Sequence, residues 1–230
     1  MEAFFNFYTI TTILLLIVWT GLFYFSHNTR REMLILGIAA VFLMPLVFTV
    51  SQLPTEVVAD GFQLVTIIDL LFTFSLAGIA GVSYHAIFGK HYHKLPRAER
   101  TKTPFGSQHW LLRLFFFFTI FVWAVLLIHL FFSLTIPVAF LIASVMMAIY
   151  TISHRHDLLL DALWSSFLTA FIVFFSTTLA SFFTATDISI TPVTSNQYIL
   201  DVPVDLIFWS LAAGLALGPL YEYIRTVELT

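Results

Sequence analysis

Two apolar stretches, far apart in the chain, match each other closely enough to decide the fold. The first runs Asp69-Leu-Leu-Phe-Thr-Phe-Ser-Leu-Ala-Gly-Ile-Ala-Gly81, and the second runs Asp205-Leu-Ile-Phe-Trp-Ser-Leu-Ala-Ala-Gly-Leu-Ala-Leu-Gly218. Both open on an aspartate, and a slip of one residue then aligns Tyr84-His85 with Tyr221-Glu222. With its apolar flanks, each stretch reaches the length of about 20 residues that a membrane-spanning helix needs. The match predicts a polytopic helical membrane protein with an internal repeat.

The composition points to the membrane independently. Of the 230 residues, 60% are hydrophobic and 10% are charged, and the mean hydropathy is +0.96. An ordinary globular domain carries about 25% charged residues, and a water-soluble fold of this size could not bury so much apolar surface. The net charge of −3 offers nucleic acids no general attraction. We therefore expect membrane lipid as a partner and no nucleic acid.

Breaks in the hydrophobic pattern divide the chain into seven expected spans, so the predicted fold class is all-α. The expected spans are 7–26, 33–51, 62–88, 110–133, 136–153, 158–183 and 203–224. The break at Ser133-Leu134-Thr135 rests on Pro137 and on length, because an unbroken helix over 110–153 would greatly exceed the thickness of a bilayer.

With seven spans, all ten Lys and Arg residues fall on one side of the membrane. Half of them lie between the third and fourth spans, namely Lys90, Lys94, Arg97, Arg100 and Lys102. Basic residues concentrate on the cytoplasmic side of membrane proteins. We therefore expect the N-terminus outside and the C-terminus in the cytoplasm.

The repeat extends beyond the two opening stretches, because Arg30-Arg31-Glu32 opens the second span as Arg155-His156-Asp157 opens the sixth. A single linking helix between two three-helix units gives both units the same orientation, a parallel 3+1+3 repeat. The expected organisation is one membrane domain over 1–230, with a first three-helix unit over 7–88, a cytoplasmic loop and linking helix over 89–133, and a second unit over 134–224.

Asp69 and Asp205 are the leading candidates for chemistry, because an ionisable group inside a span is costly and marks a functional site by default. They are equivalent residues of the repeat, and His129 of the linking helix approaches their level. Two carboxyls facing each other across a pseudo-twofold axis would share a proton. Alternatively, each aspartate caps its own helix by accepting hydrogen bonds from free amides. Both interpretations are open at this point.

Helical spacing places further side chains on the same faces as the two aspartates. Together with His129, four residues are therefore expected to contact a bound ligand: Thr73, Tyr84, Trp209 and Tyr223. The chain also holds 27 Phe residues. An aromatic-lined pocket would suit a polyene and would stabilise a carbocation by cation–π attraction.

Other ionisable residues lie near the expected helix ends. Glu222 is expected to form a structural ion pair with Arg113, and Asp157 to cap its helix or to pair with Arg155. Glu32 is expected to have a structural role in the first turn of its helix. Asp161 lies one turn deeper than Asp157 and has no assigned role.

His85, His91 and His93 are close enough in the chain to suggest a metal site. No carboxylate completes a tight local set, and Lys90 and Lys94 would repel a cation. We therefore predict no metal and no cofactor, and expect this segment to lie at anionic lipid headgroups.

Three short motifs carry a family resemblance. They are Arg155-His156-Asp157-Leu158-Leu159, Pro203-Val204-Asp205-Leu206-Ile207-Phe208 and Gly218-Pro219-Leu220-Tyr221-Glu222-Tyr223. With Gly214 and the duplicated layout, they resemble the lycopene cyclase domain of bacterial and archaeal heterodimeric cyclases and of fungal fused cyclases. That family has Pro-X-Glu-Glu ahead of the third helix of each unit. Here the two copies read Pro203-Val204-Asp205-Leu206 and Ile67-Ile68-Asp69-Leu70, so the chain resembles a divergent member.

The resemblance implies a redox-neutral isomerisation of the intramolecular lyase type. A carboxylic acid protonates the terminal double bond of an acyclic carotenoid, the cation closes to a six-membered ring, and a base removes a ring proton. Asp69 and Asp205 match the family's acids, and the resemblance does not order them. It also implies a carotenoid or other isoprenoid partner and a prokaryotic plasma membrane.

Two other functions are open. The loss of both Glu-Glu pairs favours a non-catalytic family member that binds an isoprenoid. A parallel 3+1+3 repeat also occurs in small-solute transporters, whose sites lie between the repeats. The sequence leaves the oligomeric state open.

Overall fold

The computed structural model describes residues 7–51, 66–89, 92–94, 110–183, 197–200, 202–225 and 227–229, and this part of the chain is mostly helical. The helices are α1 (Phe7–Phe25), α2 (Arg30–Ser51), α3 (Ile67–Phe88), α5 (Trp110–Phe132), α6 (Ile136–His154), the 3-10 turn η2 (His156–Leu158), α7 (Leu159–Phe183), α8 (Val204–Leu217) and α9 (Leu220–Arg225). Two antiparallel strand pairs join β1 (Tyr92–Lys94) to β4 (Val227–Leu229) and β2 (Tyr198–Ile199) to β3 (Val202–Pro203).

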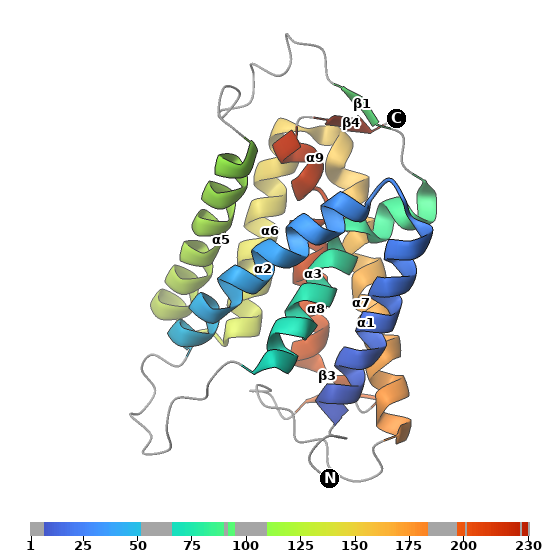
Figure 1. The fold of residues 1–230 in the computed structure, drawn as a ribbon. Coiled ribbons are helices and arrows are strands. Elements are labelled where there is room, and N and C mark those ends of the chain that lie inside the picture. Colours follow the sequence, from blue (N-terminus) through green and yellow to red (C-terminus); the bar gives the residue numbers. More distant parts are fainter. Residues whose placement is uncertain are drawn as a thin grey trace.

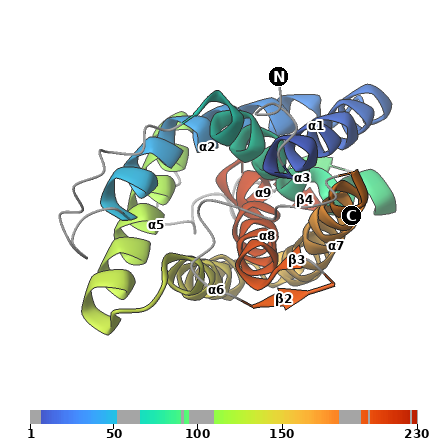
Figure 2. The same ribbon diagram turned by 90° about the horizontal axis from the view of Figure 1, so that it is seen from below.

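The long helices form one bundle with α3 and α8 near its centre (Figures 1 and 2). Successive long helices run in alternate directions (Figure 1). Helix α2 packs along α3, and α7 packs along α8, while α5 lies at the edge beside α6. Helix α9 and the β1–β4 pair lie at the upper end of the bundle in Figure 1, and β3 lies at the lower end.

Five of the described segments are helical, long and apolar enough to cross a membrane, which is compatible with an integral membrane protein. They are Phe7–Phe25, Ile67–Phe88, Trp110–Phe132, His156–Phe183 and Val204–Ile224. Helix α6 contributes a shorter apolar segment, Val138–His154. Each of the seven expected spans corresponds to a helix, but five rather than seven meet this criterion within the described residues. The count of seven membrane crossings therefore remains a prediction.

The expected break at 133–135 is confirmed, because α5 ends at Phe132 and α6 begins at Ile136. Ser133 adopts a φ of 51°, in the left-handed region that reverses a chain tightly. Pro137 follows in the first turn of α6, where a helix has no use for the missing N–H group.

Glycines allow α7 and α8 to approach closely. A Cβ atom at Gly214 would collide with the main-chain carbonyl oxygen of Ser165, and one at Gly218 would lie 2.5 Å from the Ser165 Cβ atom. A Cβ atom at Gly81 of α3 would likewise collide with the side chain of Leu36 of α2. These contacts fix how α2 and α7 lie against the central pair of helices.

Candidate functional site

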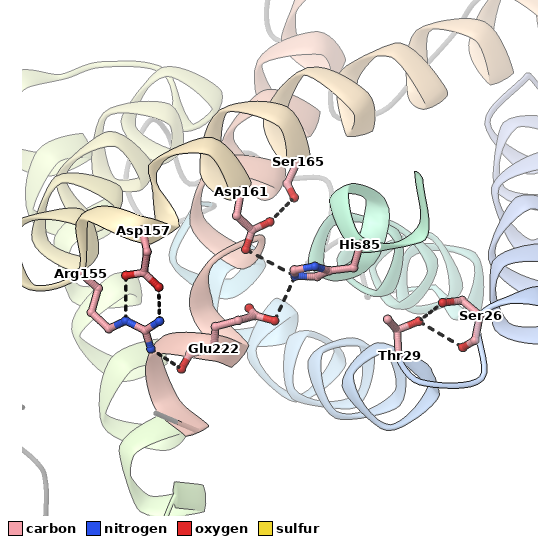
Figure 3. Close-up of polar contacts among 8 residues, drawn as sticks. All are labelled: Ser26, Thr29, His85, Arg155, Asp157, Asp161, Ser165 and Glu222. Carbon is pink, nitrogen blue, oxygen red and sulfur yellow. Dashed lines mark hydrogen bonds and ion pairs between the residues drawn. The ribbon is translucent and has the colours of Figure 1, made fainter. Parts of the chain in front are cut away.

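His85 lies at the centre of a buried polar group inside the bundle (Figure 3). Its Nε2 atom is 3.0 Å from Glu222 Oε1 and 3.6 Å from Asp161 Oδ2. All three side chains have zero solvent exposure. They belong to α3, α9 and α7, so the imidazole lies between two carboxylates that come from separate helices.

Glu32 in the first turn of α2 completes the group. It is 1% exposed, and ligand atoms of Glu32, His85 and Glu222 all lie within 4.8 Å of one another. Four helices thus bring four titratable side chains to one place. We call Glu32, His85, Asp161 and Glu222 the histidine–carboxylate cluster.

Neighbouring side chains hold the cluster in place. Ser165, one turn after Asp161 on α7, donates its Oγ hydrogen to Asp161 Oδ1 over 3.0 Å. Arg155 forms an ion pair with Asp157, which confirms one of the two roles expected for Asp157, and donates from Nη1 to the main-chain carbonyl of Glu222 at 3.4 Å. Arg155 therefore ties α9 to the turn between α6 and α7 (Figure 3).

The cluster is rich in acids. Among its described members, one imidazole faces three carboxylates. Closely spaced carboxyls share protons rather than all ionising. The cluster therefore combines groups that can hold and exchange protons.

The expected lack of a carboxylate set around His85 concerned neighbours in the chain, and the structure brings other carboxylates to it. Its carboxylate neighbours are distant in the chain and meet it only when α2, α7 and α9 pack against α3. Glu222 contacts His85, while Arg113 donates from Nη1 to the carbonyl of Ile224 at 3.3 Å. The expected ion pair between Glu222 and Arg113 stays a prediction. His91 lies outside the described residues.

Asp69 makes the hydrogen bonds of a helix cap. Its carboxylate accepts from the Thr66 main-chain N–H at 2.8 Å and from Thr66 Oγ1 at 2.7 Å, and its own N–H donates to Thr66 Oγ1 at 3.3 Å. This reciprocal pair is a capping box at the start of α3. Asp205 is 5% exposed in the first turn of α8. An acid–base role for these two aspartates remains a prediction.

The other residues expected to contact a ligand lie in different surroundings. His129 donates from Nδ1 to the carbonyl of Leu134 at 2.6 Å, and so holds the turn between α5 and α6. The ring of Trp209 packs on Phe140, with centroids 4.2 Å apart. Thr73 lies one turn after Asp69 on α3, with its hydroxyl oxygen buried.

Two of the expected ligand-contacting residues are chain neighbours of the cluster. The Tyr84 ring meets the His85 ring edge-on, with centroids 5.2 Å apart. Tyr223, which follows Glu222, is buried, and its ring centroid lies 6.0 Å from that of Phe117. Only Tyr84 of this set has a described ring contact with a member of the cluster.

The contacts at two glycines show that the cluster follows the internal repeat. Leu36 fills the space at Gly81, and Ser165 fills the space at Gly218. Glu32 lies one helical turn before Leu36, and Asp161 lies one turn before Ser165. In the same way, His85 lies one turn after Gly81, and Glu222 lies one turn after Gly218. This register equates Glu32 with Asp161 rather than with Asp157, a shift of one turn from the alignment that the opening motifs favour.

Comparisons of the chain with protein-family models, with curated proteins and with solved structures give no match. The family resemblance therefore rests on the sequence motifs alone.

Proposed function

We propose that this protein is an integral membrane enzyme that isomerises an apolar isoprenoid, with a carotenoid as the expected substrate class, by proton transfer at the histidine–carboxylate cluster. One observation carries the proposal: four titratable side chains from four helices are buried together in an apolar bundle. Burying such groups is expensive, and membrane proteins use them where protons or ions must move.

The reaction needs an acid that holds a proton and a base close to it. Protonation of a terminal double bond creates a carbocation, ring closure moves the charge into the ring, and loss of a ring proton restores the alkene. No electrons are gained or lost overall. His85 lies between Glu222 and Asp161, so one member of the cluster can deliver a proton while another accepts one.

Aromatic side chains connect the cluster with the outer surface of the bundle. The Tyr84 ring contacts both His85 and Phe88, and Phe88 contacts Trp164 with ring centroids 5.4 Å apart. Phe88 and Trp164 are 53% and 41% exposed. A polyene approaching from lipid would meet π faces along this route, and π faces stabilise carbocations.

The motifs behind the family resemblance meet at the same place. Glu222 comes from the Gly-Pro-Leu-Tyr-Glu-Tyr motif, and Arg155 from the Arg-His-Asp motif, and Arg155 donates to the Glu222 carbonyl. This convergence supports the cluster as the site of the cyclase-like chemistry. Asp69 and Asp205 remain a second acid pair to test.

The test measures ring formation in a lycopene-producing host that expresses the protein. We expect cyclised carotenoid from the wild type and a loss of at least 100-fold in His85→Gln and Glu222→Gln, because an amide supplies neither the acid nor the base. The matched control is His27→Gln, which changes an exposed histidine in the turn between α1 and α2. Membrane content and elution in detergent are compared for all variants.

Each contrary result has a definite meaning. Activity retained in Glu222→Gln, with Asp69→Asn and Asp205→Asn both inactive, would move the chemistry to the aspartate pair. A well-expressed, folded wild type without any cyclised product would reject the enzyme and favour isoprenoid binding or transport. A carotenoid extracted with the purified inactive protein would then select isoprenoid binding.

A further inference from the structure

We infer that the histidine–carboxylate cluster is a binding site for a divalent first-row transition metal ion, held by His85, Glu222 and Glu32 with Asp161 beside them. The inference rests on the donor geometry. An ion held here would occupy the side chains that the proposed isomerase uses as acid and base, so metal binding and proton transfer are alternative uses of the cluster. The inferred metal site reverses the expectation from the sequence that this region binds no metal.

The spacing of the donor atoms suits a single ion. Ligand atoms of Glu32, His85 and Glu222 lie within 4.8 Å of one another. Ligands on opposite sides of one metal ion are separated by about 4.2 Å, because each metal–nitrogen or metal–oxygen bond is about 2.1 Å long. Small movements of long glutamate side chains are therefore enough to close the set around an ion.

One carboxylate oxygen of the cluster, Asp161 Oδ2, lacks a well-placed hydrogen-bond donor. A single Nε2–H group can point well at only one acceptor, and Glu222 Oε1 is the nearer at 3.0 Å. Asp161 Oδ2 lies 3.6 Å from the same nitrogen, is fully buried, and has no hydrogen-bond partner among the described residues. It faces into the cluster while Oδ1 of the same residue is occupied by Ser165. An ion at this point would give Asp161 Oδ2 a ligand bond.

The donor types select the class of ion. One nitrogen with several carboxylate oxygens suits Zn²⁺, Fe²⁺, Mn²⁺ or Co²⁺, whereas Ca²⁺ prefers oxygen ligands alone. Ser165 would act on the ion indirectly by orienting Asp161, as the outer partners of metal ligands do.

The experiment uses the full-length protein, purified in detergent, stripped with a chelator and titrated with Co²⁺. We expect visible d–d absorption bands that saturate at about one Co²⁺ per chain, and a rise in melting temperature on metal addition. His85→Gln should lose the bands, and Ser165→Ala should weaken Co²⁺ binding about 10-fold. His27→Gln is the matched control and should bind like the wild type.

The result that overturns the inference is a folded wild type whose Co²⁺ content equals that of His85→Gln. Loss of the bands in His27→Gln would also overturn it, because the ion would then lie elsewhere. If His85→Gln does not fold, Ser165→Ala decides, since it removes one hydroxyl group and leaves every metal ligand in place. Ring formation is assayed separately on the stripped protein, so failure of metal binding and failure of the proposed activity give different results.

Discussion

Asp69 and Glu222 show two ways in which an acid is kept in an apolar bundle. Asp69 lies at a helix start, where free amide groups and the Thr66 hydroxyl supply hydrogen bonds. Glu222 has no solvent exposure and faces an imidazole and other carboxylates. The first arrangement stabilises the helix that it caps, whereas the second places an acid among other buried titratable groups, where protons are shared.

The capping role of Asp69 predicts a small effect for a conservative change. Asp69→Asn should lower the melting temperature only slightly, because the amide oxygen still accepts from Thr66, while Asp69→Ala should cost about 1 kcal/mol of stability. In a double-mutant cycle, Thr66→Ala should add little to Asp69→Ala, since the two residues share one capping box. Thermal unfolding in detergent measures both. Fully additive effects would contradict the shared cap.

At the scale of helices, the site depends on how closely α7 packs against α8. Gly214 and Gly218 lie against Ser165, and Ser165 in turn orients Asp161. Ser166 adds a hydrogen bond from its Oγ to the Leu211 carbonyl at 2.8 Å. The interface that joins the two helices therefore also sets the position of one member of the cluster.

A methyl group at this interface should be harmful although alanine favours helices. We expect Gly214→Ala to destabilise the protein by about 1–3 kcal/mol, because the new Cβ would meet the main chain of Ser165, which cannot move without shifting α7. The matched control is Gly21→Ala in α1, where nothing lies within 4 Å of the new atom. That change should be neutral or stabilise by up to about 1 kcal/mol. Equal melting temperatures for the two variants would refute the packing argument.

At the scale of the whole molecule, the helices alternate in direction and the cluster lies toward one end of the bundle. That end holds α9, the β1–β4 pair and the turn between α1 and α2 (Figure 1). The opposite end holds β3 and the turn between α5 and α6. The distribution of Lys and Arg in the sequence predicts that the end with the cluster faces the cytoplasm.

Single cysteines test this orientation directly, because the chain contains no cysteine of its own. His27→Cys lies in the exposed turn between α1 and α2, and Ser133→Cys lies in the exposed turn between α5 and α6. In intact cells, an impermeant thiol reagent should label Ser133→Cys and should label His27→Cys only after the membrane is opened. Labelling of both from outside would contradict an odd number of crossings between the two turns.

Local chain properties were enough to predict the helices and one of the ion pairs. The turn at 133–135 appears where bilayer thickness and Pro137 required it, and Asp157 pairs with Arg155, only two residues away. Hydropathy and short-range spacing can be read directly from the sequence, so neither prediction depended on contacts between distant segments. The repeated aspartates were also visible in the sequence, and the hydrogen bonds of Asp69 are those of the capping alternative.

The cluster itself required the tertiary structure. Glu32 and Asp161 each stand in the first turn of a helix, where an acid commonly stabilises the helix end and carries no information about its partner. Whether such a side chain reaches His85 depends on how each helix is rotated about its axis, and an error of one residue turns the side chain by about 100°. The contacts at Gly81 and Gly218 set those rotations, because they fix which residues of α2 and α7 lie against the central helices. Side-chain packing between distant segments therefore decided which acids meet the histidine.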